Sequence, residues 1–196
     1  MRRVFLLNAL CGIEEKEPVP KDCFCDALEI GFSLLFDALI GDLADNTGSS
    51  GFANNACDND FEGKTRGEIT RIVSGLIGIG PGMTPSSDDI LCGLIYCLQS
   101  VTGQSVYRNT VFALRQSILK NVGRTTTVSS AYLRAAAMRL PFRLLDSVLL
   151  GIHMPGPQLT SSMEKLILVG SSSGGEMLLG LALGAQLICM CNYKEK

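Results

Sequence analysis

The chain of 196 residues contains no tryptophan and a single histidine, His153, which restricts the catalytic chemistry open to it. A Ser-His-Asp or Cys-His relay needs an imidazole, and His153 directly precedes Met154-Pro155-Gly156-Pro157, a sequence typical of a loop. None of the eight cysteines forms a Cys-x-x-Cys pair, and Cys23-x-Cys25 and Cys189-x-Cys191 have no histidine nearby. These absences argue against a histidine relay and against a zinc site, so no metal ligand set is predicted and general-base chemistry falls to carboxylates.

The chain also lacks a recognisable targeting segment. Met1–Leu7 is basic and apolar, but Asn8 and Glu14 interrupt it before a secretory signal is complete. We therefore expect a cytoplasmic protein with reduced, mostly buried thiols. The apolar run Met177–Cys191 is shorter than the roughly 20 residues that a membrane span needs, so it predicts a central buried helix and no membrane association.

Acidic residues are absent from the middle of the chain, although the whole chain has a net charge of −2, which does not favour nucleic-acid binding. Residues 90–145 contain no Asp or Glu and therefore predict a positive field suited to a small anionic metabolite. The alternative is a set of solvated helix faces with apolar stems, which fits most of these cations. The basic residues of this stretch are Arg108, Arg115, Lys120, Arg124, Arg134, Arg139 and Arg143.

The hydrophobic pattern is helical, and no convincing alternating strand pattern is present. We predict a mainly α fold in which residues 1–196 form a single compact multi-helix domain with two glycine/serine-rich loops at helix N-termini. Residues 44–63 are rich in Asn, Asp, Gly and Ser and predict a flexible loop. An apolar fraction of 46% leaves a surplus that fits a subunit interface, including one between copies of this chain. The predicted helices are 22–41, 65–77, 85–100, 105–122, 127–139, 142–152, 158–169 and 176–191.

The most informative segment is the glycine-rich loop that runs from Gly78 to Asp89 and leads into an apolar helix. Its glycines permit positive φ and close approach to a ligand, and Thr84 followed by Pro85 is typical of an N-cap and first helical residue. Free amides at a helix N-terminus would bind an anion, and the acidic pair could hold Mg²⁺ or orient a substrate amide. The alternative is a tight turn whose acids only favour the helix N-terminus. The candidate residues are Gly80, Gly82, Thr84, Ser86 and Ser87 for ligand binding and Asp88 and Asp89 for catalysis.

A second segment, Gly170–Leu181, repeats this pattern near the other end of the chain. Placing Ser86 on Ser173 aligns Asp89 with Glu176 and Gly93 with Gly180. Two such segments predict two helix N-termini that converge on one pocket, and the helical glycines suggest close helix packing. The alternative is coincidence between two capped helices. The candidate residues here are Ser172, Ser173, Gly174 and Glu176.

Between these segments, Arg124 and Arg134 bracket a hydroxyl-rich helix start that includes Thr126 and Thr127. Hydroxyl, backbone amide and guanidinium donors together suit a carboxylate or a phosphate. We therefore include these four residues among the candidate ligand-binding residues.

Together the three blocks resemble the AllH-like family, long described as a domain of unknown function. The loop at 78–89 is similar to that family's GxGPGxTPSGDDxLxG motif, the segment 170–181 to its GHSSGxDxLxG motif, and residues 124–136 to its middle TTxxSxxxLxxA block. The resemblance covers residues 66–185. It implies a subunit of oxamate carbamoyltransferase, acting on oxamate and carbamoyl phosphate in allantoin and purine catabolism together with further subunits. Three positions depart from the pattern: Ser87 replaces glycine, Ser171 histidine and Glu176 aspartate.

Two functions remain open from the sequence. In the first, the two loops form a pocket in which Asp88 and Asp89 position an amide or Mg²⁺, and catalysis comes from positioning and charge stabilisation. In the second, the chain is a non-catalytic anion-binding or assembly subunit, which the Ser171 departure favours. An exposed Asp88 or Asp89 in a cleft with Arg124 or Arg134 within reach would favour the first function, and buried carboxylates without a cleft the second.

Overall fold

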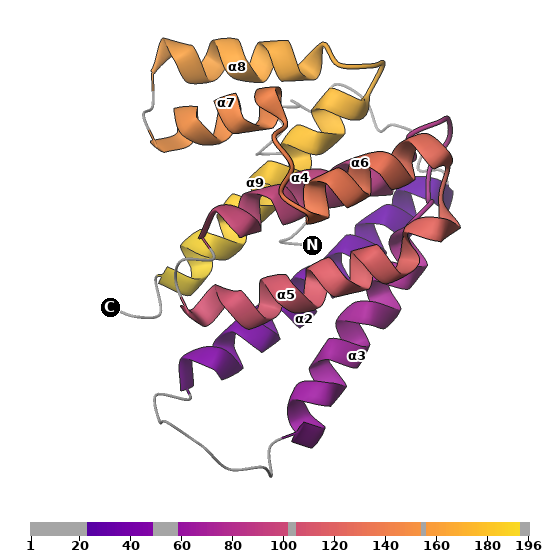
Figure 1. Ribbon diagram of the computed structural model, residues 1–196, viewed down its shortest axis with the longest axis vertical. Coiled ribbons are helices and arrows are strands. Elements are labelled where there is room, and N and C mark those ends of the chain that lie inside the picture. The colour runs from indigo at the N-terminus through magenta and orange to yellow at the C-terminus, as the bar shows by residue number, and fades with distance from the viewer. Residues whose placement is uncertain (1–22, 49–58, 102–104, 154–155, 193–196) are drawn as a thin grey trace.

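The computed structural model describes residues 23–48, 59–101, 105–153 and 156–192 (Figure 1). Within these ranges the regular structure is helical throughout, which confirms the predicted mainly α fold. Short 3₁₀ turns follow α4 at Gln99–Val101 and α5 at Val122–Arg124. The helices are α2 (Cys23–Gly48), α3 (Asn59–Leu76), α4 (Ser86–Leu98), α5 (Ser105–Asn121), α6 (Thr127–Ala137), α7 (Arg143–His153), α8 (Pro157–Ile167) and α9 (Ser173–Asn192).

The helices extend into both ends of the loop predicted at 44–63. Helix α2 continues to Gly48 and α3 begins at Asn59, so residues 44–48 and 59–63 are helical. Residues 49–58 lie outside the described residues. Once a helix has formed, each added residue gains a backbone hydrogen bond at little nucleation cost, so a polar sequence can prolong a helix that packing has already fixed.

Helix α4 lies at the centre of the fold, and all of its residues are buried. Helix α9 packs along one side of it and α6 along another, while α2, α3 and α5 pack against one another as a second group. Helices α7 and α8 form a hairpin, and α8 contacts α9. This hairpin lies at the opposite end of the molecule from the end of α2 and the start of α3 (Figure 1). The residues around the start of α4 are therefore surrounded by the rest of the fold.

Helices α4 and α9 run in the same direction and meet backbone to backbone. A Cβ atom on Gly93 would lie 2.0 Å from the carbonyl oxygen of Met177, and one on Gly180 would lie 2.0 Å from the carbonyl oxygen of Ile90. When the two segments are aligned, each contact maps onto the other with the helices exchanged, so the crossing has approximate two-fold symmetry. This confirms the close helix packing predicted from the glycines. The aligned pairs exchanged in the contacts are Gly93 with Gly180, Ile90 with Met177, and Leu94 with Leu181.

Helix α9 is long and apolar enough over Ser173–Met190 to cross a membrane, so the prediction that this run is too short for a span is wrong as to length. In this fold 39% of that window is buried. The face toward α4 is buried at Met177, Leu181 and Leu187, whereas Cys189 and Met190 are exposed. The prediction of a central helix is therefore correct for one face only. Tight packing on α4 accounts for the apolar composition of that face.

A polar network around Tyr96 fixes the connection between α6 and α7, and the sequence did not predict it. The Tyr96 hydroxyl donates to Asp146 Oδ1 at 2.7 Å and accepts from the Phe142 amide at 3.1 Å. The Arg139 guanidinium donates to the Tyr96 carbonyl at 2.8 Å and lies 4.6 Å from the ring centre. Burial, followed by the hydrogen bond to Asp146, raises the pKa of Tyr96, so the phenol stays protonated and continues to donate.

Candidate functional site

The glycine-rich loop folds back onto the start of α4. Gly78, Gly80 and Gly82 have φ values of 87°, 138° and 87°, which confirms the predicted positive φ. A Cβ atom on Gly80 would lie 2.4 Å from the Ser86 amide nitrogen, so only glycine fits there without a shift of the backbone. The loop thus places its backbone directly over the helix N-terminus.

Ser87 fastens this loop from the helix side. Its hydroxyl donates to the Ile79 carbonyl at 2.8 Å and accepts from the Ile79 amide at 3.0 Å, and its own amide donates to the same carbonyl at 3.1 Å. A glycine at this position would lack both hydroxyl hydrogen bonds. The departure from the family motif therefore strengthens the connection between loop and helix.

The prediction of Thr84 as N-cap and Pro85 as first helical residue is wrong by one position. Pro85 is the N-cap, and its carbonyl accepts from the amides of Asp88 at 2.9 Å and Asp89 at 3.3 Å. The Thr84 hydroxyl is instead hydrogen-bonded to Ser173 Oγ at 2.9 Å. Because a serine of the second loop binds the Thr84 hydroxyl, that hydroxyl does not cap the helix. The amides of Ser87, Asp88 and Asp89 all donate to loop carbonyls and are not free for an anion.

Asp88 is fully buried, and hydrogen bonds from within the protein occupy both oxygens of its carboxylate. Oδ1 accepts from the Gly78 amide at 2.9 Å, and Oδ2 accepts from Ser129 Oγ at 2.6 Å and from the Thr125 hydroxyl. These bonds join the loop, α4 and the start of α6 at one point. In this conformation Asp88 positions three segments of the chain and is not open to a substrate.

Asp89 directly follows Asp88 and is also buried, but its carboxylate lacks the hydrogen bonds that Asp88 has. It is 1% exposed, and neither carboxylate oxygen has a hydrogen-bond partner among the residues described. Burial raises the pKa of Asp89 to about 7, with a further rise from the charge of Glu176, while the neighbouring hydroxyls of Ser173 and Thr84 oppose it. Asp89 is thus a buried carboxylate that makes no well-formed hydrogen bond and that two nearby hydroxyls stabilise only in part, which is costly and makes it a candidate functional group.

The second loop brings Glu176 to the same place. Gly170 has a φ of 66°, and the Glu176 amide donates to the Ser172 carbonyl at 3.0 Å. A Cβ atom on Gly174 would lie 1.8 Å from the Leu166 carbonyl oxygen, so the start of α9 lies against the end of α8. Glu176 Oε2 is buried and has no partner in the described part of the chain. The two helix N-termini therefore meet, joined by the hydrogen bond between Thr84 and Ser173, whereas the pocket predicted between them stays a prediction.

The cationic part of the predicted site is elsewhere. The Arg124 guanidinium donates to the Ser74 hydroxyl on α3, and Arg134 is exposed on α6. Thr126 is the N-cap of α6, where its hydroxyl accepts from the Ser129 amide at 3.1 Å and also donates to the Met83 carbonyl. Neither arginine has a described contact with Asp89. Of the remaining predicted residues, Ser86 is buried, and Gly82, Thr127 and Ser172 are exposed at the edges of the site.

The side chains of Thr125 and Ser129 were missing from the predicted site, yet both bind Asp88. Thr125 is extended and precedes the N-cap of α6, whereas Ser129 lies in the first turn of that helix, so the only signal in the sequence was their shared place in the hydroxyl-rich segment. No group of three or more His, Cys, Asp or Glu side chains suited to a metal occurs in the described ranges. Asp89 and Glu176 alone could supply two carboxylates to Mg²⁺, which commonly takes one or two together with substrate phosphate oxygens.

A comparison with models of known protein families shows which family this chain belongs to. Residues 76–185 match the family model described as oxamate carbamoyltransferase subunit AllH. The chain belongs to this family. The segment that matches the AllH family model runs from the last residue of α3 into α9. It contains both loops, the hydroxyl-rich start of α6 and the reciprocal helix crossing. As a subunit of a carbamoyltransferase, AllH implies other subunits. No solved structure matches this chain.

Asp88→Asn should destabilise the chain by about 3 kcal/mol, because an amide replaces a buried charged acceptor and presents N–H groups to donors. Urea unfolding at neutral pH measures this loss. Glu164→Gln on the exposed side of α8 is the matched control and should change the free energy of unfolding by less than about 0.5 kcal/mol. Equal effects of the two substitutions would contradict the positioning role of Asp88.

Proposed function

We propose that this chain supplies part of the substrate site of a carbamoyltransferase, in which Asp89 and Glu176 hold the amide group that is transferred or accepted. The observation that carries the proposal is the buried Asp89 carboxylate, whose two oxygens lack partners among the described residues at the meeting point of the two family motifs. Carbamoyl groups and oxamate both present an NH₂ group with two N–H donors. Such a group would satisfy two carboxylate oxygens at once.

The role of the carboxylates in this proposal is positioning. A carboxylate hydrogen-bonded to the NH₂ group fixes the plane of the carbamoyl carbon relative to its attacker, and orientation of this kind contributes a large part of many rate enhancements. With its pKa at about 7, Asp89 can also accept the proton that the amide NH₂ group of oxamate loses when its nitrogen bonds to the carbamoyl carbon and phosphate leaves. The helical scaffold around Asp88 keeps the start of α4 in place while this occurs.

Asp89 is closed off in the structure, so access needs a movement of the first loop. Pro81, Gly82 and Met83 are exposed, and Met83 has 70% of its surface accessible. The hydrogen bond between Thr84 and Ser173 joins this loop to the second one. We propose that partner subunits or substrate open this contact. They would also supply the groups that bind the anionic end of the substrate, because the first-turn amides of α4 and Arg124 are already engaged.

A second candidate function is assembly without catalysis. It is the function favoured by the criterion that the sequence set, because both aspartates are buried and neither arginine has a described contact with Asp89. The exposed Ser171, which stands where the family motif has histidine, also favours it. In this case Asp89 and Glu176 would only set the packing of α4 on α9. The two functions differ in what a neutral isostere does to turnover.

Asp89→Asn in the complex reconstituted with its partner subunits should lower kcat for carbamoyl transfer roughly 100-fold without reducing complex formation. Steady-state kinetics and light scattering of the complex measure the two quantities. Glu164→Gln serves as the control and should leave both unchanged. If Asp89→Asn retains turnover within about twofold of wild type, the assembly function is correct and the catalytic one is wrong.

A further inference from the structure

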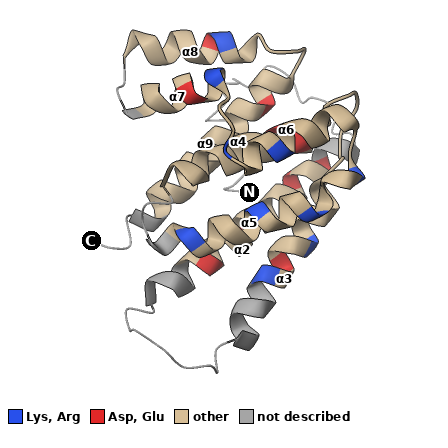
Figure 2. Ribbon diagram, in the orientation of Figure 1, with Lys and Arg blue, Asp and Glu red and all other residues tan. Residues whose placement is uncertain are grey.

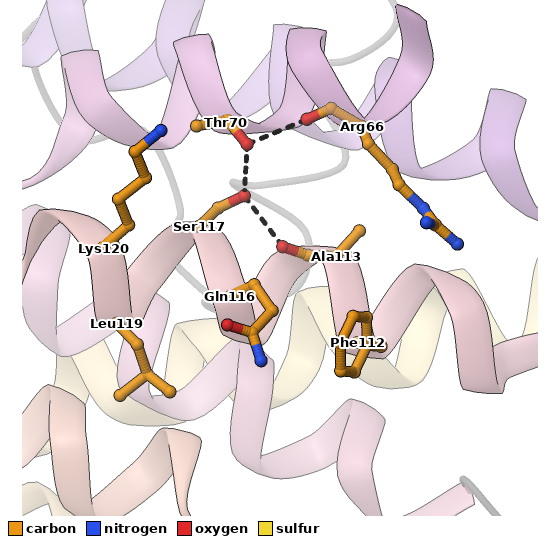
Figure 3. A pocket seen from close by; sticks show the side chains of 8 residues that line it. All are labelled: Arg66, Thr70, Phe112, Ala113, Gln116, Ser117, Leu119 and Lys120. Carbon is orange, nitrogen blue, oxygen red and sulfur yellow. Dashed lines mark hydrogen bonds between the residues drawn. The ribbon is translucent and has the colours of Figure 1, made fainter. Parts of the chain in front are cut away.

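A groove outside the Asp89 site runs between α3 and α5. Its cavity measures about 460 Å³. Figure 3 shows Lys120 at one end of it and Arg66 with Phe112 at the other, with the side chains of Thr70, Ser117 and Gln116 between them. The lining residues are Arg66, Thr70, Phe112, Ala113, Gln116, Ser117, Leu119 and Lys120.

The middle of the groove is internally satisfied. The hydroxyls of Thr70 and Ser117 are 2.8 Å apart and hydrogen-bonded to each other. Thr70 Oγ1 also lies 2.9 Å from the Arg66 carbonyl, and Ser117 Oγ lies 2.8 Å from the Ala113 carbonyl, so carbonyl acceptors surround both hydroxyl protons. This ladder ties α3 to α5 and demands no ligand. A ligand would therefore contact the ends and the rim, where Arg66 already has a contact within the protein.

The ends of the groove carry Arg66 and Lys120, and no acidic residue lines it among the side chains that the structure describes. Helix α5 lies within the acid-free stretch of the chain, and Figure 2 shows its basic positions without an acidic one. Beyond Lys120, Arg124 binds Ser74, one helical turn past Thr70 on α3. Of the seven basic residues in the acid-free stretch, Lys120 lines this groove and Arg124 lies just beyond its end, and Arg66 of α3 adds a further positive charge.

The dimensions favour a chain segment over a small metabolite. Phe112 and Lys120 are eight residues apart on one helix, which corresponds to roughly 12 Å. Phe112 is 50% exposed, so its ring is accessible to an apolar side chain lying between the cations. Because AllH is a subunit, a partner chain is available to occupy the groove.

We infer that the α3–α5 groove binds an acidic segment of a partner subunit, with carboxylates at Arg66 and Lys120 and an apolar side chain on Phe112. The inference is independent of the role of Asp89. Charge pairs across such an interface steer association and set its salt dependence, while the aromatic contact adds affinity that salt does not screen. These two contributions can therefore be measured separately.

The test is titration of purified partner subunits onto the fluorescently labelled full chain at about 50 and about 300 mM NaCl, which brackets the useful range of screening. Arg66→Glu combined with Lys120→Glu should raise the Kd at the lower salt concentration at least about tenfold and remove most of its salt dependence. Phe112→Ala should weaken binding by roughly tenfold at both concentrations. Arg71→Glu, an exposed charge change on α3 outside the groove lining, is the control and should leave Kd within about twofold.

Unchanged affinity in the double variant would overturn the inference. The milder pair Arg66→Gln and Lys120→Gln keeps the test valid if charge reversal prevents folding, since it removes the charges without adding repulsion. A rise in Tm with oxamate or carbamoyl phosphate that is present in wild type and absent in Lys120→Gln would identify a metabolite site instead, and would also overturn the partner assignment.

Discussion

Gly180→Ala should lower the free energy of unfolding by about 3 kcal/mol, although alanine is the better helix former by about 1 kcal/mol. The new Cβ would lie 2.0 Å from the Ile90 carbonyl oxygen, and that atom belongs to the backbone of a fully buried helix, so it cannot rotate away. Relief requires α9 to move off α4. Gly93→Ala should behave in the same way, because its Cβ meets the Met177 carbonyl oxygen at the same distance.

Gly41→Ala on α2 is the matched control. No atom lies within 4 Å of the position that its new methyl group would take, so it should gain about 0.5 to 1 kcal/mol in urea unfolding. The double variant Gly93→Ala with Gly180→Ala should cost less than the sum of the single variants, because one displacement of α9 relieves both clashes. Strict additivity, or a gain in stability at Gly180, would contradict the backbone contact.

Asp89→Asn should remove most of the pH dependence of stability between pH 4 and 8. The pKa of Asp89 rises from 3.8 to about 7 on folding, so the folded chain binds a proton that the unfolded chain has already lost over this range. Wild-type stability should therefore be full below pH 4 and fall as the pH rises through 7, by about 4 kcal/mol in total at about 1.4 kcal/mol per pKa unit. The asparagine variant carries no ionisable group there and should be the more stable protein at pH 8.

Urea unfolding of both proteins across this pH range measures the difference directly. Asp88→Asn should keep the wild-type slope while lying below it at every pH, since it leaves Asp89 in place. If the free energy of unfolding varied with pH in the same way for wild type and Asp89→Asn, the pKa of Asp89 would not be raised on folding, and the prediction would be wrong. A stabilising substitution that also abolishes turnover would mark Asp89 as a group kept for function at the expense of stability.

The helices and the close crossing could be predicted from sequence because their signals are local. The period of apolar residues gave each described helix to within a few residues at most ends, and the positive φ of Gly78 and Gly80 followed from the residue type. The glycines in α4 and α9 also indicated a close approach. Aligning the two segments was sufficient to pair Asp89 with Glu176.

The separate roles of the two aspartates could not be predicted. Asp88 and Asp89 are neighbours, and what distinguishes them is the pair of hydroxyls from Thr125 and Ser129, which only the folded chain brings to Asp88. Arg124 was misplaced for the same reason, because its partner Ser74 lies on α3, far away in sequence. Composition gives the number and sign of the charges, whereas the packing of the helices decides which of them lie together.

The reciprocal crossing of α4 and α9 restricts how the family can vary over evolution. Since the small residue on each helix accommodates the backbone of the other, the sites occupied by Gly93 and Gly180 belong to one contact and cannot drift separately. Related chains should retain small residues at both sites or replace both together, with a wider helix spacing. Such paired replacement would also move Asp89 away from Glu176. Related chains that lack both glycines should therefore also vary at the position of Asp89.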